Sequence, residues 1–252
     1  NLEKDGWHYD VDTKTLTLKD LNMTTGGTVG ASAGLLSVTL AMDAAIYAEQ
    51  DITINLIGDN VINKISGDGF AQAVIYSKGN ITFTGNGNLA TDHNAGAFGY
   101  NVYSDENIYL KGTGKYSIEG VPYMFSVPDG KVVEYHNGEI SITGYKAGNS
   151  YICSLDESTT FTNKAHDIKI YACDKEAGNV ADTEITEADV VNTEISRGAI
   201  HIVPAHSYTE QKEIAHAYKE GDCESGTTYY KSCSCGAISD SETFKTSAGD
   251  HD

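Results

Sequence analysis

The largest group of potential metal ligands lies near the end of the sequence and consists of His216, Cys223, Cys233 and Cys235. One histidine and three cysteines match the ligand set of a closed structural zinc site, which stabilises a segment too small to fold alone. A disulfide is the alternative in an oxidising compartment, although a pair formed among three cysteines leaves one thiol over. We expect zinc, with the disulfide as the competing interpretation.

Calcium is a second possible metal, because carboxylate oxygens are its usual protein ligands. Asp59, Asp68 and Asp92 lie in expected turns and are the candidate ligands. The sequence contains no Asp-x-Asp-x-Asp-Gly loop and no Gly-Gly-x-Gly-x-Asp repeat, which are the usual calcium-binding patterns. A solvated acidic surface is therefore the simpler interpretation of these three residues.

Tyrosine is abundant, with 16 residues, and could supply the aromatic surface that sugar-binding sites combine with amide and carboxylate groups. The candidate ligand-binding residues are Tyr100, Tyr109 and Tyr116, which we expect on outward faces. Tyr109 has the clearest pattern, because it lies between two apolar residues, Ile108 and Leu110, in an alternating strand.

Catalysis is a weaker expectation than binding. A polysaccharide lyase needs acidic residues that hold calcium and a Lys or Arg base close to the α-proton of the substrate. No Asp–Asp–Arg cluster recurs at one position of the chain. We therefore assign no catalytic residues and expect a protein that is not an enzyme, with a calcium-dependent polysaccharide lyase as the alternative.

A repeat predicts the scaffold that positions these residues. Three segments align on Tyr47, Tyr76 and Tyr103, at intervals of 29 and 27 residues. In each copy Asp or Asn follows the tyrosine by four positions, two apolar residues follow by five and seven, and Gly follows by eleven. Short alternating runs of this kind are β-strands, and Gly permits the turn that ends each run.

Parallel strands joined by turns at such a period indicate a β-solenoid, in which equivalent residues of successive coils stack. We expect the tyrosines to stack and Asp51, Asn80 and Asn107 to form a column. Their side chains can hydrogen-bond along the axis and satisfy the backbone groups of the turns. The tyrosines of the repeat, Tyr47, Tyr76 and Tyr103, are thus expected to be structural.

The pattern extends outward from this repeat and then weakens. We expect a parallel β-helix domain over residues 1–203, in which residues 150–203 either continue the solenoid or form a β cap. The Cys/His module is expected over residues 204–252, and its last residues suggest a truncated copy. A cap is needed because an open solenoid end exposes a sheet edge.

Residues 7–10 and 13–18, with the later segments 51–60 and 81–89, resemble parts of large cell-surface proteins of Gram-positive gut bacteria. The resemblance is to their carbohydrate-binding β-helix domains, which are similar to pectate-lyase-like solenoids that bind polysaccharide and calcium. It covers roughly residues 5–120. It implies an all-β, right-handed parallel β-helix in an extracellular protein, either secreted or attached to the cell surface.

The C-terminal segment resembles short tandem modules of bacterial surface proteins that contain His-x-Tyr, Cys and Tyr-Tyr-Lys-Ser-Cys-x-x-Cys-Gly. This chain departs from that pattern, because one residue separates Cys233 from Cys235 where the modules usually have two. The departure puts the tetrahedral geometry of a zinc site in doubt.

Composition limits the possible partners. The formal net charge of −19, with 17 basic residues against 36 acidic ones, excludes a nucleic-acid-binding protein. No segment has the apolar length of a membrane span. We expect a monomer that binds polysaccharide or a host glycan. The alternatives are an adhesin for a host surface protein and a structural spacer.

Overall fold

The computed structural model describes residues 2–24, 27–31, 40–63, 71–92, 99–119, 123–143, 145–147, 150–152, 160–164, 168–173, 183–185, 199–204, 208, 218–219, 227–233 and 238–245. Contacts between residues divide the chain into two compact units. The first consists of residues 1–164 and 169–203, and the second of residues 165–168 and 204–252. Each unit is described by itself.

The structure is all-β with mainly parallel sheets, which confirms the coarse fold class, and it contains one short helix among the described residues, α1 (Leu2–Asp5). The first sheet has the order β1 (Trp7–Asp10), β2 (Thr15–Lys19), β6 (Ile52–Ile57), β9 (Ile81–Gly85), β12 (Ile108–Leu110), β15 (Val132–Tyr135) and β19 (Thr160–Asn163). The second has the order β21 (Thr183–Ile185), β20 (Ile168–Cys173), β22 (Ala199–Pro204), β16 (Glu139–Thr143), β13 (Lys115–Glu119), β10 (Asn88–Asp92), β7 (Asp59–Asn63) and β3 (Asn22–Met23). The third has the order β14 (Tyr123–Ser126), β11 (Gly99–Ser104), β8 (Ala71–Ser77), β5 (Leu40–Ala48) and β4 (Gly27–Ala31).

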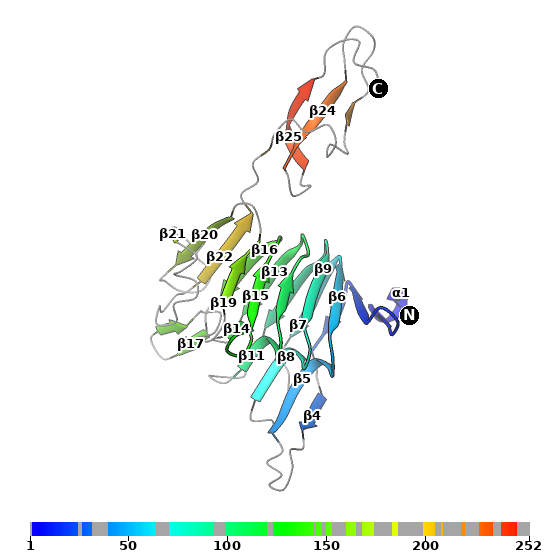
Figure 1. Ribbon diagram of the computed structural model, residues 1–252, viewed down its shortest axis with the longest axis vertical. Helices are drawn as coiled ribbons and strands as arrows, with labels where there is room; N and C mark the ends of the chain where they lie inside the picture. Colours follow the sequence, from blue (N-terminus) through cyan, green and yellow to red (C-terminus); the bar gives the residue numbers. More distant parts are fainter. Residues whose placement is uncertain are drawn as a thin grey trace. The chain divides into compact units, whose positions relative to one another are not determined.

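The chain passes through the third, first and second sheets in turn, and it does so four times. The four sets of strands, each called a coil below, are β5–β6–β7, β8–β9–β10, β11–β12–β13 and β14–β15–β16. Each strand pairs in parallel with its counterpart in the next coil, and Figure 1 shows these strands side by side. The expected alignment is confirmed, because Tyr47 pairs with Tyr76 and Tyr76 with Tyr103.

The core lies among the three sheets and is built from residues that repeat every second position along each strand. On the first sheet Ile54, Phe83 and Leu110 are fully buried and stack in register. Burying a side chain of this size stabilises the fold by about 1.5–3 kcal/mol. The alternation of Ile and Thr in β6 and β9 therefore determines which face of each strand is inside.

The two ends of the stack are built differently from its middle. At one end β1 is antiparallel to β2, and β4 is antiparallel to β5. At the other end β19 continues the first sheet in parallel, while β22 runs antiparallel to β16. Residues 150–203 thus extend the first sheet with a parallel strand and the second sheet with an antiparallel strand. They also include one strand of the hairpin formed by β17 (Tyr145–Ala147) and β18 (Ser150–Ile152).

The second unit contains a three-stranded antiparallel sheet, formed by β23 (Tyr218–Lys219), β24 (Thr228–Ser232) and β25 (Ile238–Lys245). Tyr229 stacks on Phe244 with ring centroids 5.4 Å apart. Cys233, directly after β24, is buried. An aromatic pair and a few short strands give this unit a small core of its own.

Candidate functional site

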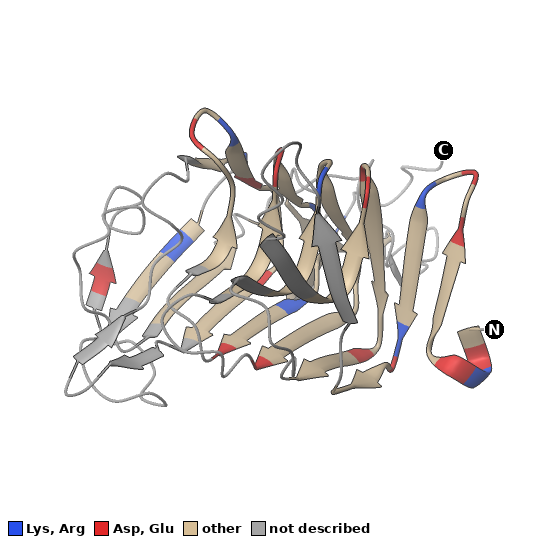
Figure 2. Ribbon diagram, turned by 90° about the horizontal axis from the view of Figure 1, so that it is seen from below, with Lys and Arg blue, Asp and Glu red and all other residues tan. Residues whose placement is uncertain are grey.

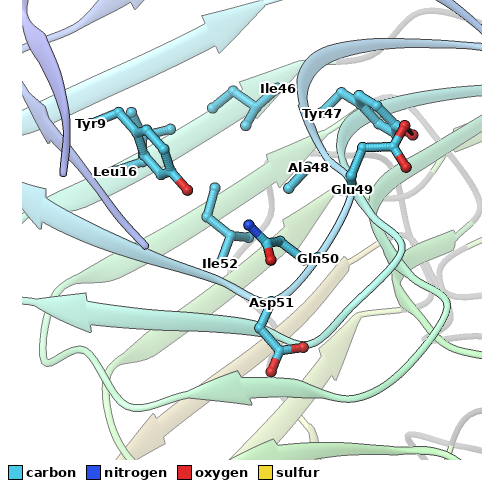
Figure 3. Close-up of a pocket in the computed structure, with 9 residues that line it drawn as sticks. All are labelled: Tyr9, Leu16, Ile46, Tyr47, Ala48, Glu49, Gln50, Asp51 and Ile52. Atoms are coloured by element: carbon cyan, nitrogen blue, oxygen red, sulfur yellow. Dashed lines mark hydrogen bonds between the residues drawn. The ribbon is translucent and has the colours of Figure 1, made fainter. Parts of the chain in front are cut away.

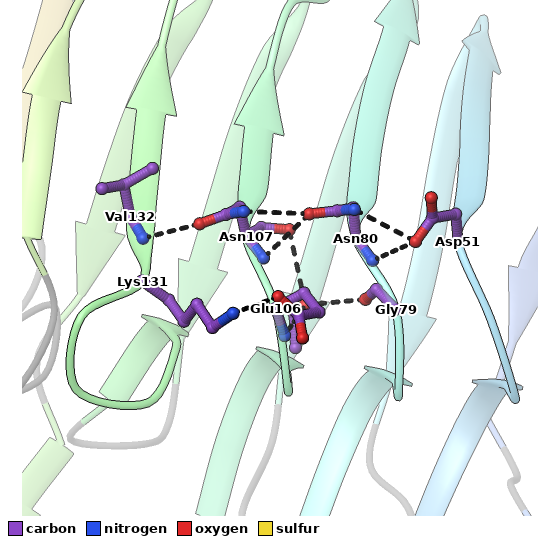
Figure 4. Close-up of polar contacts among 8 residues, drawn as sticks. Asp51, Gly79, Asn80, Glu106, Asn107, Lys131 and Val132 are labelled. Atoms are coloured by element: carbon purple, nitrogen blue, oxygen red, sulfur yellow. Dashed lines mark hydrogen bonds and ion pairs between the residues drawn. The ribbon is translucent and has the colours of Figure 1, made fainter.

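The predicted column of Asp51, Asn80 and Asn107 is present and is confirmed as a structural feature. The Asp51 carboxylate accepts hydrogen bonds from the Asn80 backbone N–H (2.8 Å) and side-chain amide (3.1 Å). The Asn80 oxygen accepts the same pair from Asn107, both at 3.1 Å. The Asn107 oxygen accepts the N–H of Val132 at 3.0 Å, so the column links four coils (Figure 4).

A second polar column runs from coil to coil at the other end of the first-sheet strands, after each strand ends. The Asp20 carboxylate accepts the Asp59 N–H at 3.0 Å, and the Asp59 carboxylate accepts the Asn88 side-chain amide at 2.7 Å. The Asn88 oxygen then accepts the N–H of Lys115 at 2.8 Å. The sequence carried a signal for this column, because Asp59, Asn88 and Lys115 repeat at the 29- and 27-residue intervals of the first column.

The calcium prediction is not supported by the position of Asp59, whose carboxylate is used in this second column. Asp92 is exposed at the end of β10, and Asp68 lies outside the described residues. In the part of the chain that the structure describes, no group of three or more His, Cys, Asp or Glu residues could hold a metal ion. Calcium binding stays a prediction.

Zinc also stays a prediction. His216, Cys223 and Cys235 lie outside the described residues, so the structure gives no geometry for the expected ligand set. Cys233 is described, and it is 1% exposed.

The tyrosines of the repeat form an aromatic column. Tyr47 and Tyr76 have ring centroids 5.4 Å apart, and Tyr76 and Tyr103 have centroids 5.8 Å apart. The hydroxyl of Tyr47 donates to Glu49, and the hydroxyl of Tyr76 donates to Asp105 at 2.9 Å. Burial and the bond to Asp105 raise the pKa of Tyr76. These contacts fit the expected structural role.

The three tyrosines predicted to bind ligand have different positions. Tyr109 is partly exposed on the outward side of β12, and the Lys111 ammonium lies 5.3 Å from its ring centroid. Tyr100 is also partly exposed, and its ring packs 4.9 Å from that of Tyr103. Nothing else in the structure tests whether these two residues bind a ligand.

The expectation that Tyr116 faces outward is wrong, because its side chain is 1% exposed. Its ring packs edge-on against Phe83 and Phe125 in the core, with centroids 5.6 and 6.2 Å away. Tyr116 shares its side of β13 with buried Ile118, and it pairs with Leu89 of β10. The alternation of β13 therefore contained the signal for burial, and burial raises the pKa of the Tyr116 hydroxyl.

A pocket of about 310 Å³ lies at the first coil and was not predicted from the sequence. Its lining residues are Tyr9 of β1, Leu16 of β2, Ile46, Tyr47 and Ala48 of β5, the turn residues Glu49, Gln50 and Asp51, and Ile52 of β6. Figure 3 shows the Tyr9 hydroxyl and the Gln50 amide directed into the space beside Leu16, Ile46 and Ile52. The pocket therefore combines apolar walls with two uncharged polar groups.

The arrangement of strands explains why this pocket is open. Tyr9 pairs with Leu16 across β1 and β2, so the two side chains share the side of the sheet that faces the core. No further coil covers them among the described residues, and Tyr9 remains 37% exposed. A neighbouring hollow of about 260 Å³ is lined by Trp7, which is 49% exposed, and shares Leu16, Ile46 and Tyr47 with the pocket.

Charged groups lie at the rim of the pocket rather than at its centre. Glu49 forms an ion pair with Lys78 at 2.8 Å and accepts the Tyr47 hydroxyl. Hydrogen bonds from Lys78 and then from Tyr47 lower the pKa of Glu49, so this carboxyl is ionised at neutral pH. In Figure 3 the carboxylates of Glu49 and Asp51 point away from Tyr9.

No family model, curated protein or solved structure matches this chain. None of the described segments forms a helix with the length and hydrophobicity that crossing a membrane requires. The assignment of function therefore depends on the geometry of the chain itself.

Proposed function

We propose that this chain is a non-catalytic, extracellular right-handed parallel β-helix of the bacterial cell-surface type, with a small C-terminal Cys/His module, and that it binds glycans. The observation that carries the proposal is the pocket formed by Tyr9, Tyr47 and Gln50 over the apolar residues of the first coil. The parallel register of four successive coils in three sheets supports the β-helix.

The chemistry of the pocket is suited to a sugar unit. A sugar ring has apolar C–H faces that pack on aromatic and aliphatic side chains, and hydroxyls that hydrogen-bond to amides and phenols. Tyr9, Leu16 and Ile46 offer the first kind of surface, and the Tyr9 hydroxyl and Gln50 amide offer the second. A volume of about 310 Å³ is at the small end of ligand sites, which suits one or two sugar residues rather than a long chain.

The cation beside the pocket supports binding without catalysis. A lyase base must be unprotonated to remove a proton, and its pKa must lie near the working pH. Lys78 donates a hydrogen bond to Glu49, and this bond together with one that it donates to Tyr47 raises the pKa of its ammonium group. Lys78 therefore stays protonated and is unsuited to act as a base.

A glycan array that includes plant, mucin and cell-wall glycans tests the proposal. We expect binding to at least one soluble oligosaccharide. The variants Tyr9→Ala and Gln50→Ala should each weaken it by about fivefold or more, because each removes a hydrogen bond or a stacking surface. Tyr171→Ala, which changes a partly exposed tyrosine on β20, is the matched control and should bind normally.

Three results would contradict the proposal. Binding that survives both pocket variants would show that the pocket is not the site. Failure to bind any glycan, together with capture of a host surface protein, would favour the adhesin alternative. A calcium-dependent rise in ultraviolet absorbance with uronate polymers would instead identify a lyase.

A further inference from the structure

The outward side of the first sheet carries a regular array of threonines on three neighbouring strands. Thr15 of β2 pairs with Thr53 of β6, which pairs with Thr82 of β9. A second row, two residues along each strand, consists of Thr17, Asn55 and Thr84. All six residues alternate with core residues and are partly exposed. We call these six residues the threonine array.

The spacing of the array is set by the sheet. Neighbouring strands lie about 4.8 Å apart, and residues two apart along a strand lie about 6.7 Å apart. The pairing of β2, β6 and β9 has no register shift, so the side chains repeat at these intervals. The hydroxyls of Thr17, Thr53, Thr82 and Thr84 make no hydrogen bond to other described residues, which leaves them available to a ligand.

The array is uncharged, although the chain has a formal net charge of −19. The first row is flanked by Asp10, which pairs with Thr15 on β1, and by Glu134, which pairs with Tyr109 on β15, and the Lys111 ammonium lies 5.3 Å from the Tyr109 ring centroid. Lys19, at the end of β2, forms an ion pair with Glu3 at 2.6 Å. Figure 2 shows charged residues gathered mainly at strand ends and turns, with the strands themselves largely uncharged.

An aromatic ring ends the first row. Tyr109 pairs with Thr82 and is partly exposed on the same side of the sheet. Thr15, Thr53, Thr82 and Tyr109 therefore form one line across four strands. Three hydroxyl and methyl groups followed by a phenol ring offer hydrogen bonds, apolar contacts and a stacking surface in sequence.

We infer that the threonine array and Tyr109 bind an uncharged, extended β-linked polysaccharide that lies across the strands, with about one sugar residue over each coil. Such a chain presents hydroxyls and C–H faces at an interval close to the strand spacing. Neutrality decides against an anionic polymer, which the −19 charge of the chain would repel. This inference rests on the proposed glycan-binding function, but it uses a different surface from the pocket.

Depletion of the whole 252-residue chain from solution by microcrystalline cellulose and by chitin particles tests the inference. The triple variant Thr17→Val, Thr53→Val, Thr82→Val removes three hydroxyls and keeps the branched shape that strands favour. We expect binding to at least one of the two solids, weakened about tenfold or more in the triple variant. Binding should change little between low and high salt, because the array is uncharged.

The matched control is Thr162→Val on β19, an outward threonine next to Glu134 and outside the array, which should bind normally. Thermal unfolding followed by circular dichroism checks that all variants are folded. Equal binding by the triple variant, absence of binding to both solids, or binding only to a charged polymer would each overturn the inference. So would capture of a protein through the array in place of a polysaccharide.

The pocket variant Tyr9→Ala separates this inference from the proposed function. If Tyr9→Ala no longer binds soluble oligosaccharides while the triple variant still binds the solids, the pocket is supported as a binding site and the inference about the threonine array is overturned. If the triple variant alone loses binding to solids while Tyr9→Ala binds everything normally, the array stands and the pocket is overturned.

Discussion

Gln50 and Asp51 are neighbours in the chain and both line the pocket, but only Asp51 belongs to the first polar column. Asp51 begins the polar column, and its counterparts Asn80 and Asn107 repeat its hydrogen bonds. Gln50 lines the pocket, and its counterparts in the next two coils are Gly79 and Glu106. Asp51 therefore helps to hold the coils together, whereas the side chain of Gln50, which has no counterpart of its kind in the next two coils, is available to a ligand.

The largest expected effect falls on the turns where coils touch most closely. A Cβ added at Gly114 would lie 1.9 Å from the backbone oxygen of Gly87, so Gly114→Ala must separate two coils. We expect a loss of about 3 kcal/mol or more in the free energy of unfolding. Urea unfolding followed by circular dichroism measures it.

Gly130→Ala is the matched control for this substitution. Nothing lies within 4 Å of an added Cβ at Gly130, whose φ is +79°. Only backbone strain opposes this change, and it should cost about 1 kcal/mol. Equal losses for the two variants would show that contact between coils does not limit the turns.

The second largest effect is expected in the column itself. Asn80→Ala removes the amide that bonds to Asp51 and the oxygen that accepts two donors of Asn107. We expect a loss of about 2 kcal/mol, because a backbone N–H is left without its partner. Asp51→Asn keeps an acceptor at the start of the column and should unfold close to the wild-type midpoint. A smaller loss for Asn80→Ala than for Asp51→Asn would contradict the structural role of the column.

A smaller effect, dependent on pH, is expected at Glu139. Its carboxylate contacts Lys115 at 2.6 Å and His201 at 2.9 Å, and so joins β13, β16 and β22. Partial burial raises the pKa of Glu139, but the bonds from Lys115 and His201 outweigh burial and hold it below the ordinary 4.5. The stability from this carboxylate is thus present above pH 4.5 and lost as the pH falls through the lowered pKa.

Unfolding of Glu139→Gln at several pH values checks this expectation. The variant should be less stable than the wild type by under about 1 kcal/mol at neutral pH, because the pair is partly exposed. The difference should disappear in acid. A constant difference from neutral to acidic pH would show that the charge of Glu139 does not stabilise the fold.

The smallest effect on stability is expected in the pocket. Gln50 is exposed, and Gln50→Ala should change the free energy of unfolding by about 0.5 kcal/mol or less while weakening glycan binding. Calorimetric titration of a glycan identified on the array measures binding, and thermal unfolding measures stability. A large loss of stability would place Gln50 with the residues that hold the coils together.

The strands, the tyrosine column and the first polar column were predicted from the sequence because their signals are local and repeated, whereas the second polar column carried the same signal and was missed. Alternation placed Ile108 and Leu110 inside and left Tyr109 partly exposed. The same rule, applied to β13, would have placed Tyr116 inside with Ile118. That error came from treating a tyrosine as an outward residue without checking which side of its strand it shares.

The pocket could not be predicted in the same way. Tyr9 and Gln50 do not repeat, and their exposure depends on which coil ends the stack and on the antiparallel pairing of β1 with β2. Antiparallel closure by β22 likewise depends on contacts between residues about sixty positions apart, such as Ser141 and His201. Distant pairings of this kind leave no periodic signal in the sequence.

The two polar columns also determine where the chain tolerates a change in length. Asp51 and Asp59 are eight residues apart, and the same separation recurs between Asn80 and Asn88 and between Asn107 and Lys115. The coils nevertheless differ in length, since the intervals between these residues along the columns are 29 and 27 residues. Extra residues are therefore accommodated outside this eight-residue segment. An insertion within it would shift the side chains of one coil out of register and break hydrogen bonds of both columns.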